Sequence, residues 1–158
     1  MIYLDYDINR YTDLYTLEKI HKLFLKYNKT HTISVIMECL WDSRGVWEWV
    51  TTTPNIEVTL HGWRHINYSE QSYVSTHFEL KLAKEYWNNN RVRCANRSKH
   101  LTEFYPPWND ASADVIQACV DLGMEYKDVT KGQYFTFHWW EYVCGRNLDK
   151  LEEVLSKC

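Results

Sequence analysis

The sequence predicts an α/β fold built on a largely parallel sheet. Strand-like and helix-like segments alternate along its 158 residues, which is typical of βα units. That length suits one domain and leaves little room for a second. Hydrophobic residues make up 45% and charged residues 25%, values that are ordinary for a globular chain and exclude disorder. We therefore expect a single domain over residues 1–158.

The first half of the chain begins with a strand in which apolar and acidic side chains alternate. A helix follows, with apolar residues three and four positions apart. After a second strand, a short helix is stopped by Pro54, and a third strand ends at His61. The expected strands are residues 2–7, 32–39 and 56–60, and the expected helices are residues 13–27 and 45–50.

The second half continues the same alternation. Ser112 is a suitable N-cap for one helix, and Gly123 is a fitting residue just past its end. Pro106 and Pro107 stop the strand that precedes this helix. The expected strands are residues 101–105, 124–127 and 133–138, and the expected helices are residues 72–88, 112–122 and 147 or 148 to 156.

Charge and composition narrow the range of partners. The net charge of −3 gives no electrostatic reason to expect a nucleic acid or an anionic membrane. Aromatic residues reach 16%, with eight Trp and twelve Tyr, enough for a heavy core and for faces that stack on a ligand. One basic run keeps nucleic-acid binding as an alternative, although a solvated loop is the preferred interpretation. This run contains Arg91, Arg93, Arg97, Lys99 and His100.

No segment of the sequence predicts export or membrane insertion. Carboxylates at Asp5 and Asp7 interrupt the place where a signal peptide would be apolar, and no apolar run is long enough to span a bilayer. Five cysteines form no C-x-x-C pair, which favours reduced thiols. We expect a cytoplasmic product that lysis releases or a virion carries. The compact size and the Asn- and Tyr-rich usage favour a phage or other viral origin, and the sequence leaves the oligomeric state open.

Chemically versatile residues fall where predicted strands end, which is where α/β folds bind ligands. Asp5 and Asp7 end the first strand, and alternation predicts that both carboxylates share one face. His61 and His65 follow the third strand at a spacing of four. His138 ends the strand over residues 133–138. Each signal alone is weak, since D-x-D is equally a solvated turn and a lone His is more often core. Their order along the chain gives them weight.

This order resembles the NodB-like polysaccharide deacetylase family, the metal-dependent carbohydrate esterases. The family's first motif holds two acidic residues, and some members separate them by one residue, as Asp5-Tyr6-Asp7 does. The family's histidine pair matches His61 and His65. Its R-x-P-aromatic motif matches Tyr105-Pro106-Pro107-Trp108 in part, and its final apolar-His motif matches Phe137-His138. The resemblance implies a distorted (β/α) barrel of mostly parallel strands.

Several departures accompany the resemblance. Tyr105 replaces the arginine that orients the base in the family, and Asn109 replaces a glycine. The fourth motif, an Asp near a Trp, has no clear match, and Asp128 is a poor candidate. The chain is also short for the family, which predicts that a strand–helix unit is missing or trimmed.

The resemblance implies a site with assigned roles. Asp7, His61 and His65 would hold one divalent metal ion, with zinc expected first and cobalt, nickel or manganese as substitutes. Asp5 would be the general base, and His138 would protonate the leaving group. The backbone N–H of Trp108 would stabilise the oxyanion. Phe137 would form the pocket for the acetyl methyl group. The further expected substrate contacts are Tyr105, Pro107, Trp63 and Trp139, with Trp140 as another stacking candidate.

The implied activity is removal of N-acetyl (or O-acetyl) groups from a hexosamine-containing glycan such as peptidoglycan or chitooligosaccharide. The expected partner is thus a glycan and neither a nucleic acid nor a membrane. The alternative is a glycan-binding module that has kept the fold and lost catalysis. The replaced arginine and the unplaced fourth motif favour that alternative.

Overall fold

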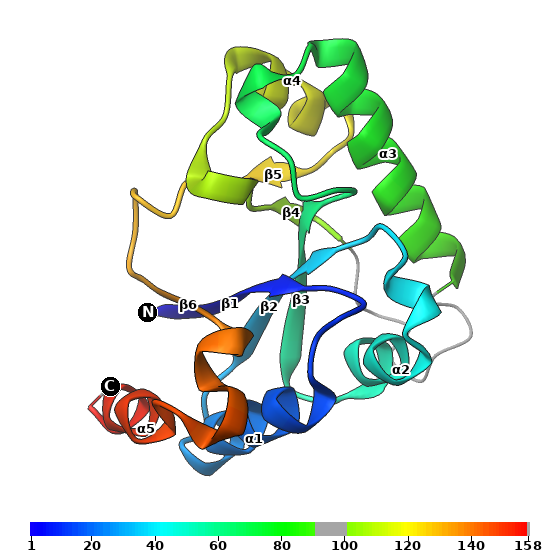
Figure 1. The fold of residues 1–158 in the computed structure, drawn as a ribbon. Helices are drawn as coiled ribbons and strands as arrows, with labels where there is room; N and C mark the ends of the chain where they lie inside the picture. Colours follow the sequence, from blue (N-terminus) through cyan, green and yellow to red (C-terminus); the bar gives the residue numbers. More distant parts are fainter. Residues whose placement is uncertain (91–100, 158) are drawn as a thin grey trace.

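A computed structural model of the chain describes residues 1–90 and 101–157. Six strands in this part form one parallel sheet in the order β5-β4-β3-β2-β1-β6 (Figure 1). The basic run over residues 91–100 lies outside the described residues. The strands are β1 (Ile2–Ile8), β2 (His31–Ile36), β3 (Ile56–Gly62), β4 (Glu103–Phe104), β5 (Glu125–Tyr126) and β6 (Tyr134–His138).

The strand order is that of a barrel opened at one place. Consecutive strands are neighbours from β1 to β5, and β6 returns to pair with the other edge of β1. Helices precede β2, β3, β4 and β5, whereas residues 127–133, between β5 and β6, contain no helix. The expectation of a distorted, trimmed barrel is confirmed. The opening lies between β5 and β6, where no pairing closes the described strands into a ring.

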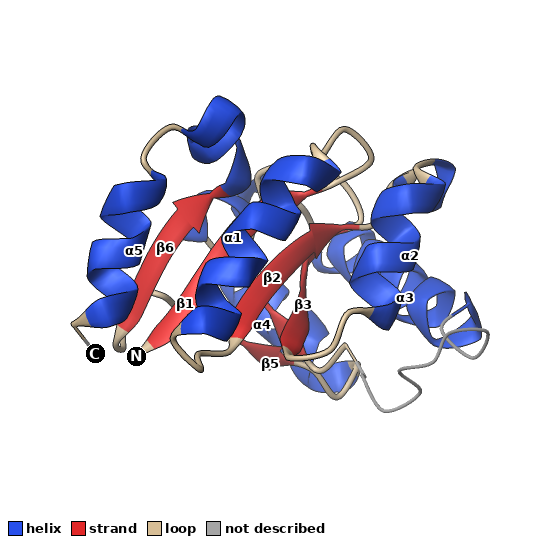
Figure 2. Ribbon diagram, turned by 90° about the horizontal axis from the view of Figure 1, so that it is seen from below, coloured by secondary structure: helices blue, strands red, loops and turns tan. Residues whose placement is uncertain are grey.

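In the part of the chain that the structure describes, five α-helices lie on the outer side of the curved sheet (Figures 1 and 2). Asp13 caps the first of them by accepting a hydrogen bond from the Thr16 N–H, and Ser112 caps α4 through the Val115 N–H. Gly123 follows α4 with a φ of +61°, as expected for a residue that ends a helix. The helices are α1 (Leu14–Lys26), α2 (Arg44–Thr52), α3 (Tyr73–Asn90), α4 (Ala113–Asp121) and α5 (Leu148–Ser156).

The predicted elements are all present, with shifted ends. β2 stops at Ile36, short of the predicted residue 39, because the chain turns through a left-handed Cys39 into a 3₁₀ helix, η1 (Leu40–Asp42). β4 and β5 have only two residues each. None of the described helices is long and apolar enough to cross a bilayer. The described cysteines Cys39, Cys119 and Cys144 are free thiols.

The sheet separates distinct cores, and β1 contributes to both of its faces. Tyr3 packs with Phe24 of α1 in the core that also holds α5. Leu4 and Tyr6 point into the curve of the sheet, where they pack with Tyr105. The larger core lies between the sheet and the helices α2, α3 and α4. Tyr3 of β1 therefore faces the helices, and Leu4 and Tyr6 face the interior.

Candidate active site

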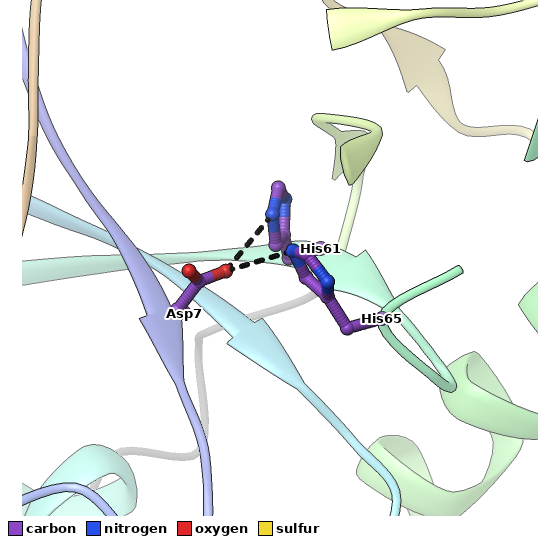
Figure 3. A group of neighbouring side chains, drawn as sticks. All are labelled: Asp7, His61 and His65. Atoms are coloured by element: carbon purple, nitrogen blue, oxygen red, sulfur yellow. Dashed lines mark ion pairs between the residues drawn. The ribbon is translucent and has the colours of Figure 1, made fainter. Parts of the chain in front are cut away.

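The three predicted metal ligands converge at the carboxyl ends of β1 and β3. The Oδ1 atom of Asp7 lies 3.3 Å from Nε2 of His61 and 3.2 Å from Nε2 of His65 (Figure 3). One ligand atom from each side chain lies within 4.8 Å of the others. Two nitrogens and one oxygen form a donor set typical of a catalytic site for a divalent transition metal.

Asp7 reaches this place through an unusual backbone conformation. Its φ is +62°, and the pairing of β1 with β2 shifts register between Asp5 and Ile8. Two side chains hold the Asp7 carbonyl oxygen: Asn9 donates from Nδ2 at 2.7 Å and Trp139 from Nε1 at 3.2 Å. Strained backbone of this kind persists where the surroundings hold it, and it often occurs at functional sites.

The loop that carries His65 is anchored to α3. Gly62 has a φ of +122°, and a Cβ there would lie 2.7 Å from the Tyr68 hydroxyl oxygen, so the loop requires glycine. The Tyr68 hydroxyl donates to Oε2 of the buried Glu79 at 2.9 Å, and Arg64 Nε donates to Oε1 of Glu79 at 3.0 Å. A buried carboxylate on α3 therefore holds both residues that shape the turn between the two histidines.

The hydrogen bonding of His61 fits a cation at this site. Its Nδ1 lies 2.6 Å from the Tyr105 carbonyl oxygen, which can only accept, so Nδ1 carries the proton. Nε2 of the neutral ring then presents a lone pair to the Asp7 carboxylate, another acceptor. Burial lowers the pKa of His61. A second proton, placed on Nε2 between the two acceptors, is therefore disfavoured. A metal ion would satisfy both acceptors, and tetrahedral coordination at about 2.0–2.2 Å separates ligands by about 3.3–3.6 Å, close to the spacing observed.

The protonation state of Asp7 also suits a role as metal ligand. Burial raises the pKa of this carboxyl, but the facing His61 and His65 rings lower it more. The net pKa lies below the ordinary value, so the carboxylate is ionised at neutral pH. An ionised carboxylate and neutral imidazoles are the forms that bind metal.

These residues line a cavity of about 350 Å³. His138 enters it from the end of β6, with Nε2 3.7 Å from Oδ2 of Asp7. Two exposed indoles stand beside it: the Trp108 ring lies 4.6 Å from that of His65, and the Trp140 ring stacks on His138 at 4.7 Å. The lining residues are Tyr6, Asp7, His61, His65, Trp108, Asn109, Thr136 and His138.

The structure does not bring Asp5 to this cavity, so its expected position beside Asp7 is wrong. Asp5 is fully buried on the helix-facing side of β1, and its Oδ2 lies 3.3 Å from Nε2 of His31. Burial raises the pKa of this carboxyl well above its ordinary value. The alternation of β1 holds through Tyr6, and the left-handed Asp7 then breaks it. As a result, the residue that faces the cavity beside Asp7 is Tyr6.

Most of the predicted substrate contacts also lie elsewhere. Phe137 packs in the core with α1 and α5 and does not line the cavity. Tyr105 and Pro107 are buried, and Tyr105 acts on the site through its carbonyl oxygen. Trp63 packs against the core beside Trp41, at a ring distance of 5.7 Å. Neighbours on a strand face opposite sides, so Phe137 faces the helices while His138 faces the cavity.

Trp139, Trp108 and Asp128 complete the comparison with the expected site. Trp139 holds the Asp7 backbone through its indole N–H and is packed against both large cores. Trp108 lies in the 3₁₀ helix η4 (Pro107–Asn109) with a φ of +57° and does line the cavity. Asp128 bonds to Thr130 and pairs with Lys131 away from the cavity.

Sequence reasoning missed Glu141 and Asn109. The Oε1 atom of Glu141 lies 2.9 Å from Nδ1 of His138 and accepts the His138 backbone N–H at 3.1 Å. Asn109 Oδ1 accepts a hydrogen bond from the Tyr6 hydroxyl at 3.0 Å. The spacing of three between His138 and Glu141 was a visible signal, because it is that of a capping box. The Tyr6–Asn109 contact joins residues 103 apart and left no such signal.

Comparison with known proteins supports the fold. No family model matches the sequence, and no curated relative matches it. A structural match is a mutant of a CE4 family pseudoenzyme with restored enzymatic activity, with a TM-score of 0.74, 14% identity, and coverage of 99% of this chain and 62% of that one. The wild-type pseudoenzyme, from Bacillus anthracis, matches with a TM-score of 0.72, 15% identity, and coverage of 98% and 60%. The chain has the CE4 deacetylase fold.

Other matching structures are those of a deacetylase and an esterase. The peptidoglycan deacetylase PdaC from Bacillus subtilis matches with a TM-score of 0.69, 12% identity, and coverage of 99% of this chain and 81% of that one. A family 4 acetyl xylan esterase from Clostridium thermocellum, in complex with cobalt, matches with a TM-score of 0.64, 10% identity, and coverage of 98% and 82%. The chain spans about three fifths of the length of the pseudoenzyme structures. At these identities the likeness concerns the fold.

Proposed function

We propose that residues 1–158 form a single deacetylase-like domain that hydrolyses N-acetyl (or O-acetyl) groups on a hexosamine-containing glycan and depends on a divalent metal, zinc first. The observation that carries the proposal is the convergence of Asp7, His61 and His65 beside His138 at the carboxyl ends of the strands. The cavity there is large enough for a sugar carrying an acetyl group. The glycan deacetylases and esterases that share the fold support this substrate class.

Each residue of the cavity has a part in this proposal. Asp7, His61 and His65 would hold the metal, which supplies polarisation of the acetyl carbonyl and acidification of water when bound. His138 faces the same space and would transfer protons at Nε2. The exposed indoles of Trp108 and Trp140 would stack on sugar rings on either side of the reacting group. The Trp108 N–H would donate to the developing oxyanion.

Metal analysis and an acetate assay test the proposal together. Purified protein is dialysed against zinc, cobalt, nickel or manganese, and bound metal is measured by mass spectrometry. Acetate release is then followed with chitohexaose and with a peptidoglycan digest. We expect about one metal ion per chain and metal-dependent acetate release. His61→Ala should lose both. Protein that binds no metal and releases no acetate from either glycan would refute the proposal.

A second candidate function is glycan binding without hydrolysis. It is favoured by one observation: Asp7 is the only carboxylate among the described residues that line the cavity. The pseudoenzyme structures with the same fold show that the fold occurs without activity. Calorimetry with chitohexaose distinguishes the two functions, because a binding module would give measurable affinity while the acetate assay stayed at background.

A further inference from the structure

Two proton transfers are needed to hydrolyse an amide, and the cavity offers few groups to perform them. Water must lose a proton as it attacks the carbonyl carbon, and the leaving nitrogen must gain one. Asp7 faces His61 and His65 and is committed to the metal site. The Tyr6 hydroxyl donates its hydrogen bond to Oδ1 of Asn109. Among the described lining residues, His138 is the remaining side chain of a type that can both accept and donate a proton in catalysis.

The surroundings of His138 determine which of its ring nitrogens carries the proton and which presents a lone pair. Oε1 of Glu141 lies 2.9 Å from Nδ1, and a carboxylate can only accept, so Nδ1 carries the proton. Nε2 of the neutral ring is then an acceptor, and it faces the cavity 3.7 Å from Oδ2 of Asp7. The same Glu141 oxygen accepts the His138 backbone N–H, and the Trp140 indole covers one face of the ring.

We propose that Glu141 positions His138 so that this single imidazole performs both proton transfers. This inference rests on the proposed function. Nε2 takes a proton from water as the water oxygen forms a bond to the acetyl carbon. The resulting imidazolium is stabilised by the Glu141 carboxylate at Nδ1. When the bond between carbon and nitrogen breaks, the same proton passes from Nε2 to the leaving amine. Acetic acid and amine are released, the acid gives up its own proton to the solvent or the amine to become acetate, and His138 returns to its starting state.

The positioning role is tested first without reference to activity. Long-range ¹H–¹⁵N NMR at pH 8 on ¹⁵N-histidine-labelled protein reports which ring nitrogen carries the proton, and the His138→Gln spectrum assigns the signal. We expect a protonated Nδ1 in wild type and in Glu141→Gln, whose amide oxygen still accepts. Glu141→Ala should give a tautomer mixture or a reversal. An unchanged tautomer in Glu141→Ala would overturn the positioning role. Glu153→Gln, on α5 and paired with Lys157, is the matched control.

Two substrates with different leaving groups then separate the two proton transfers. Nitrophenolate leaves without protonation, so hydrolysis of 4-nitrophenyl acetate needs the base step alone, whereas chitohexaose needs both. We expect His138→Ala to lose about 100-fold or more in kcat on each substrate. If His138→Ala keeps the ester rate and loses only the amide rate, another group removes the water proton and the proposal is wrong.

Substitutions of Glu141 complete the test. Glu141→Ala should lower kcat about 100-fold on both substrates with KM changed little, and Glu141→Asp should recover part of the rate. A normal kcat in Glu141→Ala would refute the inference while leaving the deacetylase function standing. If metal-loaded wild type hydrolyses neither substrate, the proposed function fails and the proton-transfer role with it, and the NMR result still decides whether Glu141 orients the ring.

Discussion

The two aspartates of β1 are two residues apart, each faces histidine, and their surroundings are opposite. Asp7 lies in the cavity with His61 and His65, and we refer to these three residues as the cavity group. Asp5 lies behind β1 against His31, and these two residues form the buried group. Histidines lower the pKa of Asp7, whereas burial raises that of Asp5. The same residue type is thus ionised and open to a ligand on one side and sealed in a core on the other.

The difference lies in what surrounds each pair. Aromatic rings enclose the buried group, with the His31 ring stacked on Phe24 at 4.4 Å and 10°. The cavity group is more open, because the His65 side chain is 37% exposed and that of Asp7 20%. A D-x-D pattern next to histidine is therefore not enough to identify a metal site, because solvent access and the direction of each carboxylate decide its chemistry.

The sharpest test of this comparison replaces each of the two aspartates, in separate variants, with asparagine. Asp7→Asn should weaken zinc binding by at least about 100-fold, more than is typical for a residue outside the coordination shell. Asp5→Asn should leave the zinc affinity within about threefold of wild type, since Asp5 lies outside the cavity and has no metal to hold. Competition titration with a zinc indicator measures both. Equal losses in the two variants would mean that Asp5 belongs to the site.

A pair of glycines tests how strongly the cavity group depends on its loop. Gly62→Ala places a Cβ 2.7 Å from the Arg64 carbonyl oxygen at a φ of +122°, and should lower the free energy of unfolding by about 3 kcal/mol. Gly123→Ala meets only the Lys84 ammonium at 3.9 Å and should cost about 1 kcal/mol through its positive φ. Urea unfolding gives both values. Similar losses would show that the close contacts at Gly62 are unimportant.

The free energy of unfolding at acidic pH should report on the buried group. Burial lowers the pKa of His31 to about 3, below its unfolded value, so the unfolded chain takes up this proton first. The His31 contribution to stability is present above pH 6.5 and falls as the pH is lowered toward 3, by at most about 1.4 kcal/mol per pH unit. The raised pKa of Asp5 acts in the opposite direction.

The comparison of His31→Gln with wild type isolates the part of the pH dependence of stability that His31 contributes. Urea unfolding of both proteins at pH 7, 6, 5 and 4.5 should show a smaller loss of stability with acid in the variant. His77→Gln, on α3 and outside the buried group, should keep the wild-type slope. Parallel curves for wild type and His31→Gln would show that His31 does not titrate abnormally.

The smallest expected effect concerns the anchor behind the loop of the cavity group. Glu79→Gln keeps the shape of the side chain but removes the charge that Arg64 and the Tyr68 hydroxyl contact. We expect a loss of about 1–2 kcal/mol in unfolding free energy and about a tenfold loss in zinc affinity. Glu85 is exposed on the same helix, and Glu85→Gln should change neither the unfolding free energy nor the zinc affinity. An unchanged zinc affinity in Glu79→Gln would show that His65 needs no support from α3.

Much of the fold followed from local patterns, and the site followed only in part. The positions of β1, α1, β3 and α4 were predicted within about two residues, because periodicity and capping residues such as Ser112 act locally. The predicted end of β2 lies three residues too far along the chain, and β4 and β5 are shorter than predicted, because strand ends depend on partner strands. The convergence of Asp7 with the histidine pair followed from strand order, since parallel strands end at one edge.

The sequence by itself determined that β and α units alternate and that an aspartate and two histidines lie at or just past the ends of two strands. Only the tertiary structure decided which aspartate joins the histidines and where the barrel opens. Alternation along β1 predicts one face for Asp5 and Asp7, but the left-handed backbone of Asp7 turns it to the sheet edge. That conformation is held by donors from Asn9 and Trp139, the latter more than 130 residues away. Contacts at such separation leave no periodic trace in the chain, and packing alone selects them.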